Sequence, residues 1–421
     1  MSAHATRDLS KDRLRIDDLA PGVATTALLA GGAGMAASLI LAAFNAESFF
    51  RGFVVNFSFW TSLALGGLFF VILQHLTRAG WSVVVRRIAE NFSTALPVMA
   101  ALSLILLIPM VIGWPAAIHD VYPWTDAAHV EHDHVLHGKQ AYLNVPFFVI
   151  RFIVYFGVWA LMTQYFRGTS IRQDHGGDDA LTSQMQARSA PAMLVYALTA
   201  TFFAVDLLMT LEPHWFSTIF GVYFFAGGTL GFFALLAITM NALQNAGRVE
   251  HAITTEHYHD VGKLIFAFTV FWAYIGFSQY MLIWYANLPE ETFWFDIRQE
   301  RPWLYLSLTL LFGHFVVPFL LLISRNVKRN RALLIPAAIW VLIMHWLDQT
   351  WLVLPHVASR DIAGAAVHSA PLGTMDVVQC LTNLVGVGGL WVWSVARSMG
   401  AASLIPERDP RLSESLAFEN F

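Results

Sequence analysis

Ten long apolar segments dominate this sequence and restrict its possible folds more than any other feature. Each approaches or exceeds about 20 residues, the length that an α-helix needs to cross roughly 30 Å of hydrocarbon. They run over Val23–Phe44, Gly52–Leu76, Ser93–Ile118, Leu143–Phe166, Pro191–Leu211, Phe216–Leu243, Val261–Leu288, Trp303–Ser324, Ala332–Leu354 and Gly373–Ala396. Only 13% of the 421 residues are charged, too few to cover a soluble surface. We therefore predict an all-α membrane protein with ten transmembrane helices, and the composition argues against a soluble enzyme, a nucleic-acid binder or a disordered chain.

The distribution of positive charge predicts how these helices are oriented. Of the 25 lysines and arginines, 19 belong to the N-terminal segment, the C-terminal tail and the loops after every second helix. Five belong to the opposite loops, and Arg151 lies within a helix. The positive-inside rule then places both termini in the cytoplasm. The expected parts are a cytoplasmic segment 1–22, a transmembrane domain 23–396 and a cytoplasmic tail 397–421, in the inner (cytoplasmic) membrane, and no signal peptide is recognisable at the start.

A single cysteine limits the redox groups that the chain itself can hold. One thiol cannot provide a cysteine-bound iron–sulfur cluster, a CxxCH haem attachment or a disulfide framework. Electron-carrying metals, if the protein serves them, are therefore expected in other subunits. Three histidines lie within the spans, His75, His314 and His345, so one haem between His314 and His345 remains an alternative.

Two stretches of the sequence match each other and indicate a duplication. The fifth span ends in VDLLMTLEPHW and the ninth in LDQTWLVLPHV, and the matched positions are 142 residues apart. The aligned pairs are Asp206 with Asp348, Pro213 with Pro355 and His214 with His356. Because both spans cross in the same direction, we predict a parallel repeat of helices two to five and six to nine, forming two four-helix bundles. Helices one and ten flank the bundles; chance similarity is the alternative.

Ionisable side chains gather inside and beside the predicted spans. An Asp, Lys or Arg near the centre of a membrane helix costs about 2.5 to 3.5 kcal/mol on insertion scales. The candidates for proton transfer or a quinone site are Arg151, Asp206, Glu212, His214, His314, His345, Asp348 and Asp376 towards the outer side, and His259, Asp260 and Lys263 towards the inner side. His345 and Asp348 share a helix face and could exchange a proton directly. We predict a proton-conducting or substrate-binding interior; the alternative is that Arg151 forms a structural ion pair with one Asp and the histidines bond to buried carbonyls.

A histidine-rich loop follows the third span. It contains His129, His132, His134 and His137, interleaved with acidic residues. Such spacing can supply ligands to zinc or copper, although it follows no specific metal motif. The other interpretation, which we favour, is a hydrated surface that faces a partner protein.

Two segments resemble a known family of membrane proteins. They are EPHWFSTIFGVYFFAGG, from Glu212 to Gly228, and HYHDVGKLIFAFTVFWAYIGFSQYMLIWYANLPEET, from His257 to Thr292. Both are similar to the integral membrane subunits of bacterial alternative complex III, which are relatives of the NrfD and polysulfide-reductase membrane subunits. The similarity favours the ActF-type subunit over its paralogue ActC.

The resemblance implies a respiratory complex and a division of labour within it. The expected partners are an ActC-like membrane subunit, iron–sulfur and cytochrome c subunits on the outer side, lipids, and a terminal oxidase as a possible electron acceptor. The partner subunits would carry haem c and the iron–sulfur clusters, and this chain would hold no covalent cofactor but could bind menaquinone or ubiquinone. The motif residues that transfer are Glu212, His214, His257, His259 and Lys263.

Four functional hypotheses remain at this level. In the first, Lys263, His259 and Asp260 open an inner half-channel, and Asp206, His345 and Asp348 form an outer one. In the second, the subunit binds quinol itself, with His345 or Asp206 accepting a proton. A secondary transporter is the third, because parallel repeats with buried charges also describe that class, and a passive membrane anchor is the fourth.

Overall fold

Ten long helices cross the molecule in the computed structural model, which describes residues 9–360 and 367–420. The first eight residues of the expected cytoplasmic segment lie outside the described residues. Helix accounts for 79% of the structure, and the ten helices are long and apolar enough to span a membrane. The prediction of an all-α, multi-pass membrane protein is therefore confirmed.

The helices have these bounds: α1 (Ala20–Ala42), α2 (Ala46–Leu76), α3 (Val83–Ser93), α4 (Leu96–Ile112), α8 (Val145–Gly176), α9 (Asp179–Leu207), α10 (Phe220–Asn245), α11 (Thr255–Ala286), α13 (Trp303–Thr309), the π-helix η4 (Leu310–Val316), α14 (Val317–Leu322), α16 (Arg331–Val353) and α17 (Thr374–Gly400). The short elements are the 3-10 helices η1 (Leu9–Lys11), η2 (Pro123–Thr125) and η3 (Met209–Leu211), the helices α5 (Ala117–Val121), α6 (Ala127–His132), α7 (His134–Lys139), α12 (Pro289–Gln299), α15 (Arg325–Arg329) and α18 (Leu412–Leu416), and the antiparallel strands β1 (Val357–Arg360) and β2 (Val367–Ser369).

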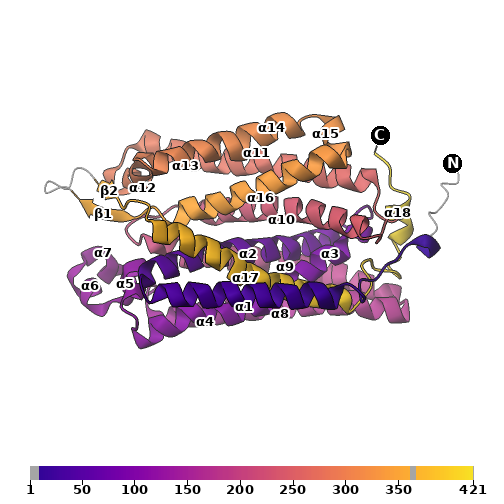
Figure 1. The fold of residues 1–421 in the computed structure, drawn as a ribbon, viewed down its shortest axis with the longest axis horizontal. Helices are drawn as coiled ribbons and strands as arrows, with labels where there is room; N and C mark the ends of the chain where they lie inside the picture. Colours follow the sequence, from indigo (N-terminus) through magenta and orange to yellow (C-terminus); the bar gives the residue numbers. More distant parts are fainter. Residues whose placement is uncertain (1–8, 361–366, 421) are drawn as a thin grey trace.

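The long helices form two groups that lie side by side (Figure 1). One group contains α2, α4, α8 and α9, with α3 leading into α4, and the other contains α10, α11, the α13–η4–α14 helix and α16. Helix α2 joins the groups because it packs against both α10 and α16. Helices α1 and α17 pack against each other and flank the first group, as the repeat predicted. Their contact is close because glycines face each other: a Cβ on Gly389 would lie 2.5 Å from Gly31.

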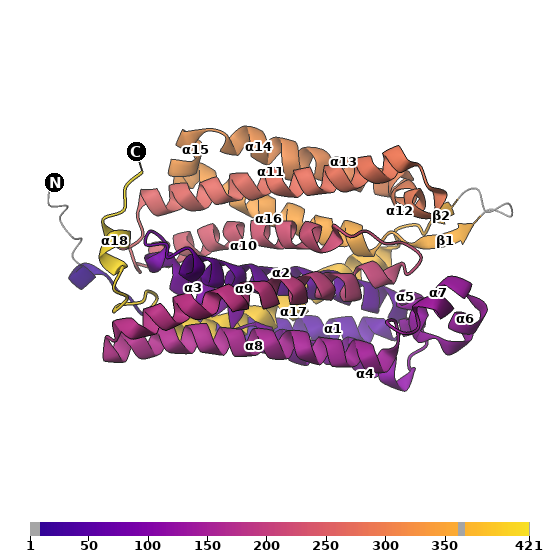
Figure 2. The same ribbon diagram turned by 180° about the vertical axis from the view of Figure 1, so that it is seen from behind.

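The described chain begins and finishes at the same end of the molecule (Figure 2), which we call the basic end because most lysines and arginines belong to it. The opposite end carries α5–α7, α12 and the β1–β2 hairpin. Hydropathy misplaced the third span, which runs over Val83–Ile112 rather than Ser93–Ile118. The reason is the composition of α3. Its charged residues Arg86, Arg87 and Glu90 are typical of a loop, but all 11 residues of this helix are buried.

Candidate functional site

Asp206, near the end of α9, forms a closed ion pair. Arg151 of α8 donates to both carboxylate oxygens, with Nε 2.7 Å from Oδ2 and Nη2 3.0 Å from Oδ1. The hydroxyl of Tyr155 donates to Oδ2 at 2.7 Å, and the guanidinium also lies 3.9 Å from the ring centroid of Tyr142. Asp206 is completely buried. Arg151 therefore forms the structural ion pair that was the alternative interpretation, and its positive charge compensates the buried carboxylate of Asp206.

Asp348 occupies the matched position in α16, but its partners are neutral. The hydroxyl of Tyr223 on α10 donates to Oδ1, and the indole N–H of Trp272 on α11 donates to Oδ2 at 3.3 Å. No lysine or arginine pairs with Asp348 among the described residues, although the side chain is only 1% exposed. A cationic partner keeps a buried acid charged, whereas a buried acid without such a partner can exchange a proton.

His345 lies beside Asp348 but does not bond to it. Its Nε2 lies 2.9 Å from the hydroxyl of Ser62 on α2, and its Nδ1 has no hydrogen-bond partner among residues 9–360 and 367–420. A Cβ on Gly227 would meet both His345 Nδ1, at 3.3 Å, and Asp348 Oδ2, at 3.4 Å. His345 and Asp348 share a helix face, as expected, but they do not hydrogen-bond to each other. Both side chains instead lie close to Gly227 of α10.

His314 lies in the π-helix η4, on the far side of Trp272. Its ring stacks on the indole with centroids 4.2 Å apart, whereas the ring of His345 packs against Phe59 at 5.4 Å. Both imidazoles are completely buried. The ring of His314 is stacked on its neighbour at an interplanar angle of 23°, whereas the ring of His345 is tilted by 40°. A haem between the two histidines stays an alternative to a role in proton transfer.

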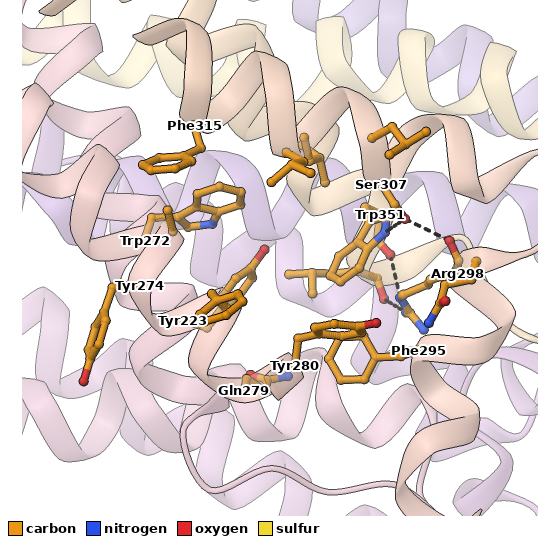
Figure 3. Close-up of a pocket in the computed structure, with 18 of the residues that line it drawn as sticks. Tyr223, Trp272, Tyr274, Gln279, Tyr280, Phe295, Arg298, Ser307, Phe315 and Trp351 are labelled. Carbon is orange, nitrogen blue, oxygen red and sulfur yellow. Dashed lines mark hydrogen bonds between the residues drawn. The ribbon is translucent and has the colours of Figure 1, made fainter. Parts of the chain in front are cut away.

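A cavity of about 580 Å³ opens beside this group on the lateral surface (Figure 3). Its walls come from α10, α11, α12, α13, η4 and the end of α16. Tyr223 and Trp272 form part of the lining, and both donate to Asp348, which does not line the cavity itself. At the rim, Tyr274 and Phe277 are each 63% exposed. The cavity is therefore an apolar chamber open towards lipid with a buried acid behind its wall.

Two further polar groups reach the cavity. Arg298 of α12 is buried and stacks on Trp294 at 3.4 Å, while its nitrogens donate to the carbonyls of Trp294, Trp351 and Leu352. It thereby satisfies carbonyls at the end of α16. Gln279 of α11 also lines the cavity, and its buried Oε1 has no hydrogen-bond partner among the described residues. A ligand hydroxyl in the chamber can therefore donate to Gln279.

A second cluster lies at the opposite end, outside the spans. Nε2 of His214 lies 2.6 Å from Asp133 Oδ2, and Nδ1 lies 3.3 Å from Glu212 Oε1. The hydrogen bond to Glu212 raises the pKa of His214 above its ordinary value; burial opposes this effect and Asp133 adds to it. For Asp133, burial acts to raise the pKa, but the backbone N–H of Leu136 and the His214 side chain lower it overall. The cluster is therefore an ion-paired tie between the α6–α7 junction and the loop that precedes α10.

The remaining candidates lie apart from the cavity. Asp376 is in the first turn of α17, where it accepts from the Ser48 hydroxyl at 2.5 Å and from the backbone N–H of Gly373 at 2.9 Å. The bond from Gly373 caps the start of α17, and the bond from Ser48 ties α17 to α2. Asp376 thus has a structural explanation that needs no proton chemistry.

At the basic end, Lys263 forms an ion pair with Asp260 one turn away and donates to Asn420 of the tail at 2.9 Å. His259 is buried nearby, and its Nδ1 has no hydrogen-bond partner among the described residues. Hydrogen bonds within the described chain do not connect this group to Asp348. The two expected half-channels are therefore separate clusters at opposite ends.

The histidine loop forms α6 and α7, with His129 and His132 on the first and His134 and His137 on the second. Among the residues that the structure describes, no three histidines, cysteines, aspartates or glutamates are grouped closely enough to hold a metal ion. The donor geometry does not fit the metal alternative.

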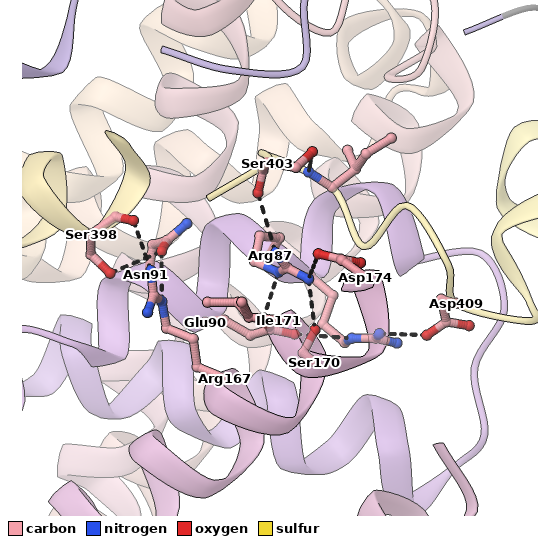
Figure 4. A network of polar contacts seen from close by, with 12 residues as sticks. Arg87, Glu90, Asn91, Arg167, Ser170, Ile171, Asp174, Ser398, Ser403 and Asp409 are labelled. Atoms are coloured by element: carbon pink, nitrogen blue, oxygen red, sulfur yellow. Dashed lines mark hydrogen bonds and ion pairs between the residues drawn. The ribbon is translucent and has the colours of Figure 1, made fainter. Parts of the chain in front are cut away.

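Sequence reasoning missed Tyr223 and Trp272, because an aromatic residue in an apolar helix resembles ordinary core. It also missed a buried charge network at the basic end (Figure 4). Arg87 bonds to Asp174 at 2.8 Å and Arg86 to Asp409 of the tail at 2.6 Å, with Glu90 beside both arginines. The spacing of these residues in the sequence does not predict the network, because Asp409 lies 323 residues from Arg86.

No protein-family model matches this chain, and no curated protein matches it.

Proposed function

We propose that this chain is the membrane subunit of a quinol:electron-acceptor oxidoreductase and that quinol binds in the lateral cavity. The observation that carries the proposal is the position of Tyr223 and Trp272, which line an apolar, lipid-facing chamber and donate to Asp348 behind it. A lipophilic quinol enters such a chamber from the bilayer. Its ring suits the aromatic walls, and its hydroxyl can donate to Gln279.

Oxidation of a quinol releases protons together with electrons. Tyr223 lies between the cavity and Asp348, so the hydroxyl can pass a proton to the carboxylate, which has no cation to hold it charged. Asp206 cannot take this role because Arg151 and Tyr155 already occupy its oxygens. His345, beside Gly227, is the next group that could receive the proton, and release towards the opposite end contributes to proton translocation.

The electrons must leave through other proteins, since one cysteine cannot hold a cluster. The similarity of Glu212–Gly228 and His257–Thr292 to subunits of alternative complex III supports iron–sulfur and cytochrome c partners at the opposite end, in the inner membrane of a bacterium. In this arrangement the clusters oxidise the quinol and cytochrome c or an oxidase receives the electrons.

The test is purification through a tag on this chain, in mild detergent, followed by haem and iron analysis and quinol:cytochrome c activity. We expect haem and activity to co-purify. Asp348→Asn should assemble normally but lower turnover at least about tenfold, as expected for a positioned proton acceptor. Asp376→Asn, which changes an acid that lies apart from the cavity, is the matched control and should retain activity. A colourless, solitary protein would contradict the proposal and favour a transporter, and equal activity of the Asp348→Asn variant would exclude the assigned proton acceptor.

A further inference from the structure

A groove of about 460 Å³ lies between α1 and α17 at the basic end, far from the cavity already described. Thr25 and Leu28 of α1 form one wall, and Trp393 and Arg397 of α17 form the other. Asp17, which precedes α1, also lines the groove. Because α17 ends at Gly400 and α1 begins at Ala20, the charged residues are at the depth of lipid headgroups and the apolar residues lie deeper.

Arg397 has an uncommitted guanidinium. It lies 5.2 Å from the centroid of the Trp393 ring, and it makes no hydrogen bond or ion pair within the described part of the chain. Most other arginines at this end are committed, as Arg86 is to Asp409 and Arg87 to Asp174. A planar guanidinium presents several donors that match phosphate oxygens.

Asp17 gives the groove a second charge of opposite sign. It is exposed, and it too makes no hydrogen bond or ion pair among the described residues. A ligand that fits both groups carries an anion for Arg397 and a cation that can donate to Asp17. A phosphate followed by a primary ammonium has this order of charges, whereas a purely anionic headgroup meets repulsion from Asp17.

We propose that this groove binds a phospholipid with a phosphoethanolamine headgroup. Arg397 contacts the phosphate, Asp17 accepts from the ammonium, and an acyl chain lies between Leu28 and Trp393. This site does not depend on the quinol function, since it uses neither the cavity nor Asp348.

The test uses the full chain, delipidated in mild detergent and then mixed with phosphatidylethanolamine or phosphatidylglycerol. Native mass spectrometry counts the bound lipid, and the unfolding temperature reports stabilisation. We expect phosphatidylethanolamine to bind more tightly, and Arg397→Gln to weaken that binding about fivefold or more. Arg325→Gln is the matched control, because Arg325 is also exposed and has no hydrogen bond or ion pair within the described chain. It should change the affinity by less than about twofold.

Asp17→Asn tests the headgroup assignment separately. Without the carboxylate, phosphatidylglycerol should bind as well as phosphatidylethanolamine. Thr25→Trp should reduce the binding of both lipids by filling the groove. Tighter binding of phosphatidylglycerol to the unmodified chain, equal losses for the Arg397 and Arg325 variants, or unchanged selectivity in Asp17→Asn would each overturn the proposal.

Discussion

Asp206 and Asp348 stand at matched positions near the ends of α9 and α16, but only Asp206 has a cationic partner. The repeat in the sequence predicted the pair of acids and their depth. It could not predict which acid Arg151 neutralises, because the answer depends on how α8 packs beside α9. Nor could it select Tyr223, since a tyrosine is identified as a donor only when its acceptor is located.

The ion pair predicts a stability difference between the two acids. Asp206→Asn should lower the free energy of unfolding by about 3 to 5 kcal/mol, because Arg151 would remain buried without a counter-charge. Asp348→Asn leaves no cation unpaired and should cost much less. Thermal unfolding of both variants in the same detergent measures this, and equal losses would contradict the assignment of roles.

The cluster at the opposite end predicts a pH dependence. The pKa of His214 is raised in the folded protein. Its contribution to stability is therefore complete below the pKa of the unfolded chain, 6.5, and is lost as the pH rises through the higher pKa of the folded state. The lowered pKa of Asp133 means that its contribution is present above the unfolded value of 3.8 and is lost as pH falls through the lower folded value. The tie should therefore be complete between these two unfolded values and weaken in alkaline buffer.

Hydrogen exchange of residues 126–140 measures this tie across the pH range. Protection should fall as pH rises beyond the His214 transition, after correction for the intrinsic exchange rate. His214→Gln should remove the transition, whereas His129→Gln, in the same loop, should retain it. A transition that survives in His214→Gln would contradict the assignment.

At the scale of single elements, the site depends on small residues and an irregular helix. The π-helix η4 places His314 against Trp272, and π-helical turns are frequent at functional sites. On α10, glycines admit the ring of His345. Apolar periodicity predicts that these helices exist, but it does not distinguish a π-turn from an α-turn or a glycine that admits a ring from one that faces lipid.

Helix α10 offers a direct test of this packing. A Cβ on Gly231 would lie 2.6 Å from His345 Cδ2 and 2.9 Å from a methyl carbon of Leu63. Gly231→Ala should therefore displace α16 and cost about 1 to 3 kcal/mol of stability. Gly157→Ala on α8 is the control, because a Cβ there meets nothing within 4 Å. Similar unfolding temperatures for the two variants would contradict the close packing of α10 and α16.

At the scale of the whole molecule, the charge network at the basic end holds the C-terminal tail against α3. The count of spans was predictable because long apolar segments have few alternatives to crossing a bilayer. The contact between the C-terminal tail and α3 was not predictable, because it joins residues that lie far apart in the sequence. The charged groups of the network, including Arg86, Arg87, Glu90, Asp174 and Asp409, offset one another within a buried volume.

Breaking one contact of this network should release the tail. Asp409→Asn removes the shorter of the two ion pairs of Arg86, the one that joins it to the tail. It should therefore make residues 403–420 more accessible to protease. Glu407→Gln changes an exposed acid two residues away and should leave the digestion rate unchanged. Equal digestion of the two variants would show that the ion pair does not hold the tail.

The central claim is that quinol binds in the lateral cavity beside Tyr223 and Trp272. It is tested most directly by photolabelling the purified protein with an azido-quinone and mapping the labelled peptides, with excess quinol as competitor. We predict competed labelling of the cavity segments of α11, α12 and the α13–η4 helix, within residues 270–280, 294–299 and 307–311. Labelling confined to other helices, or labelling that quinol does not compete, would contradict the claim.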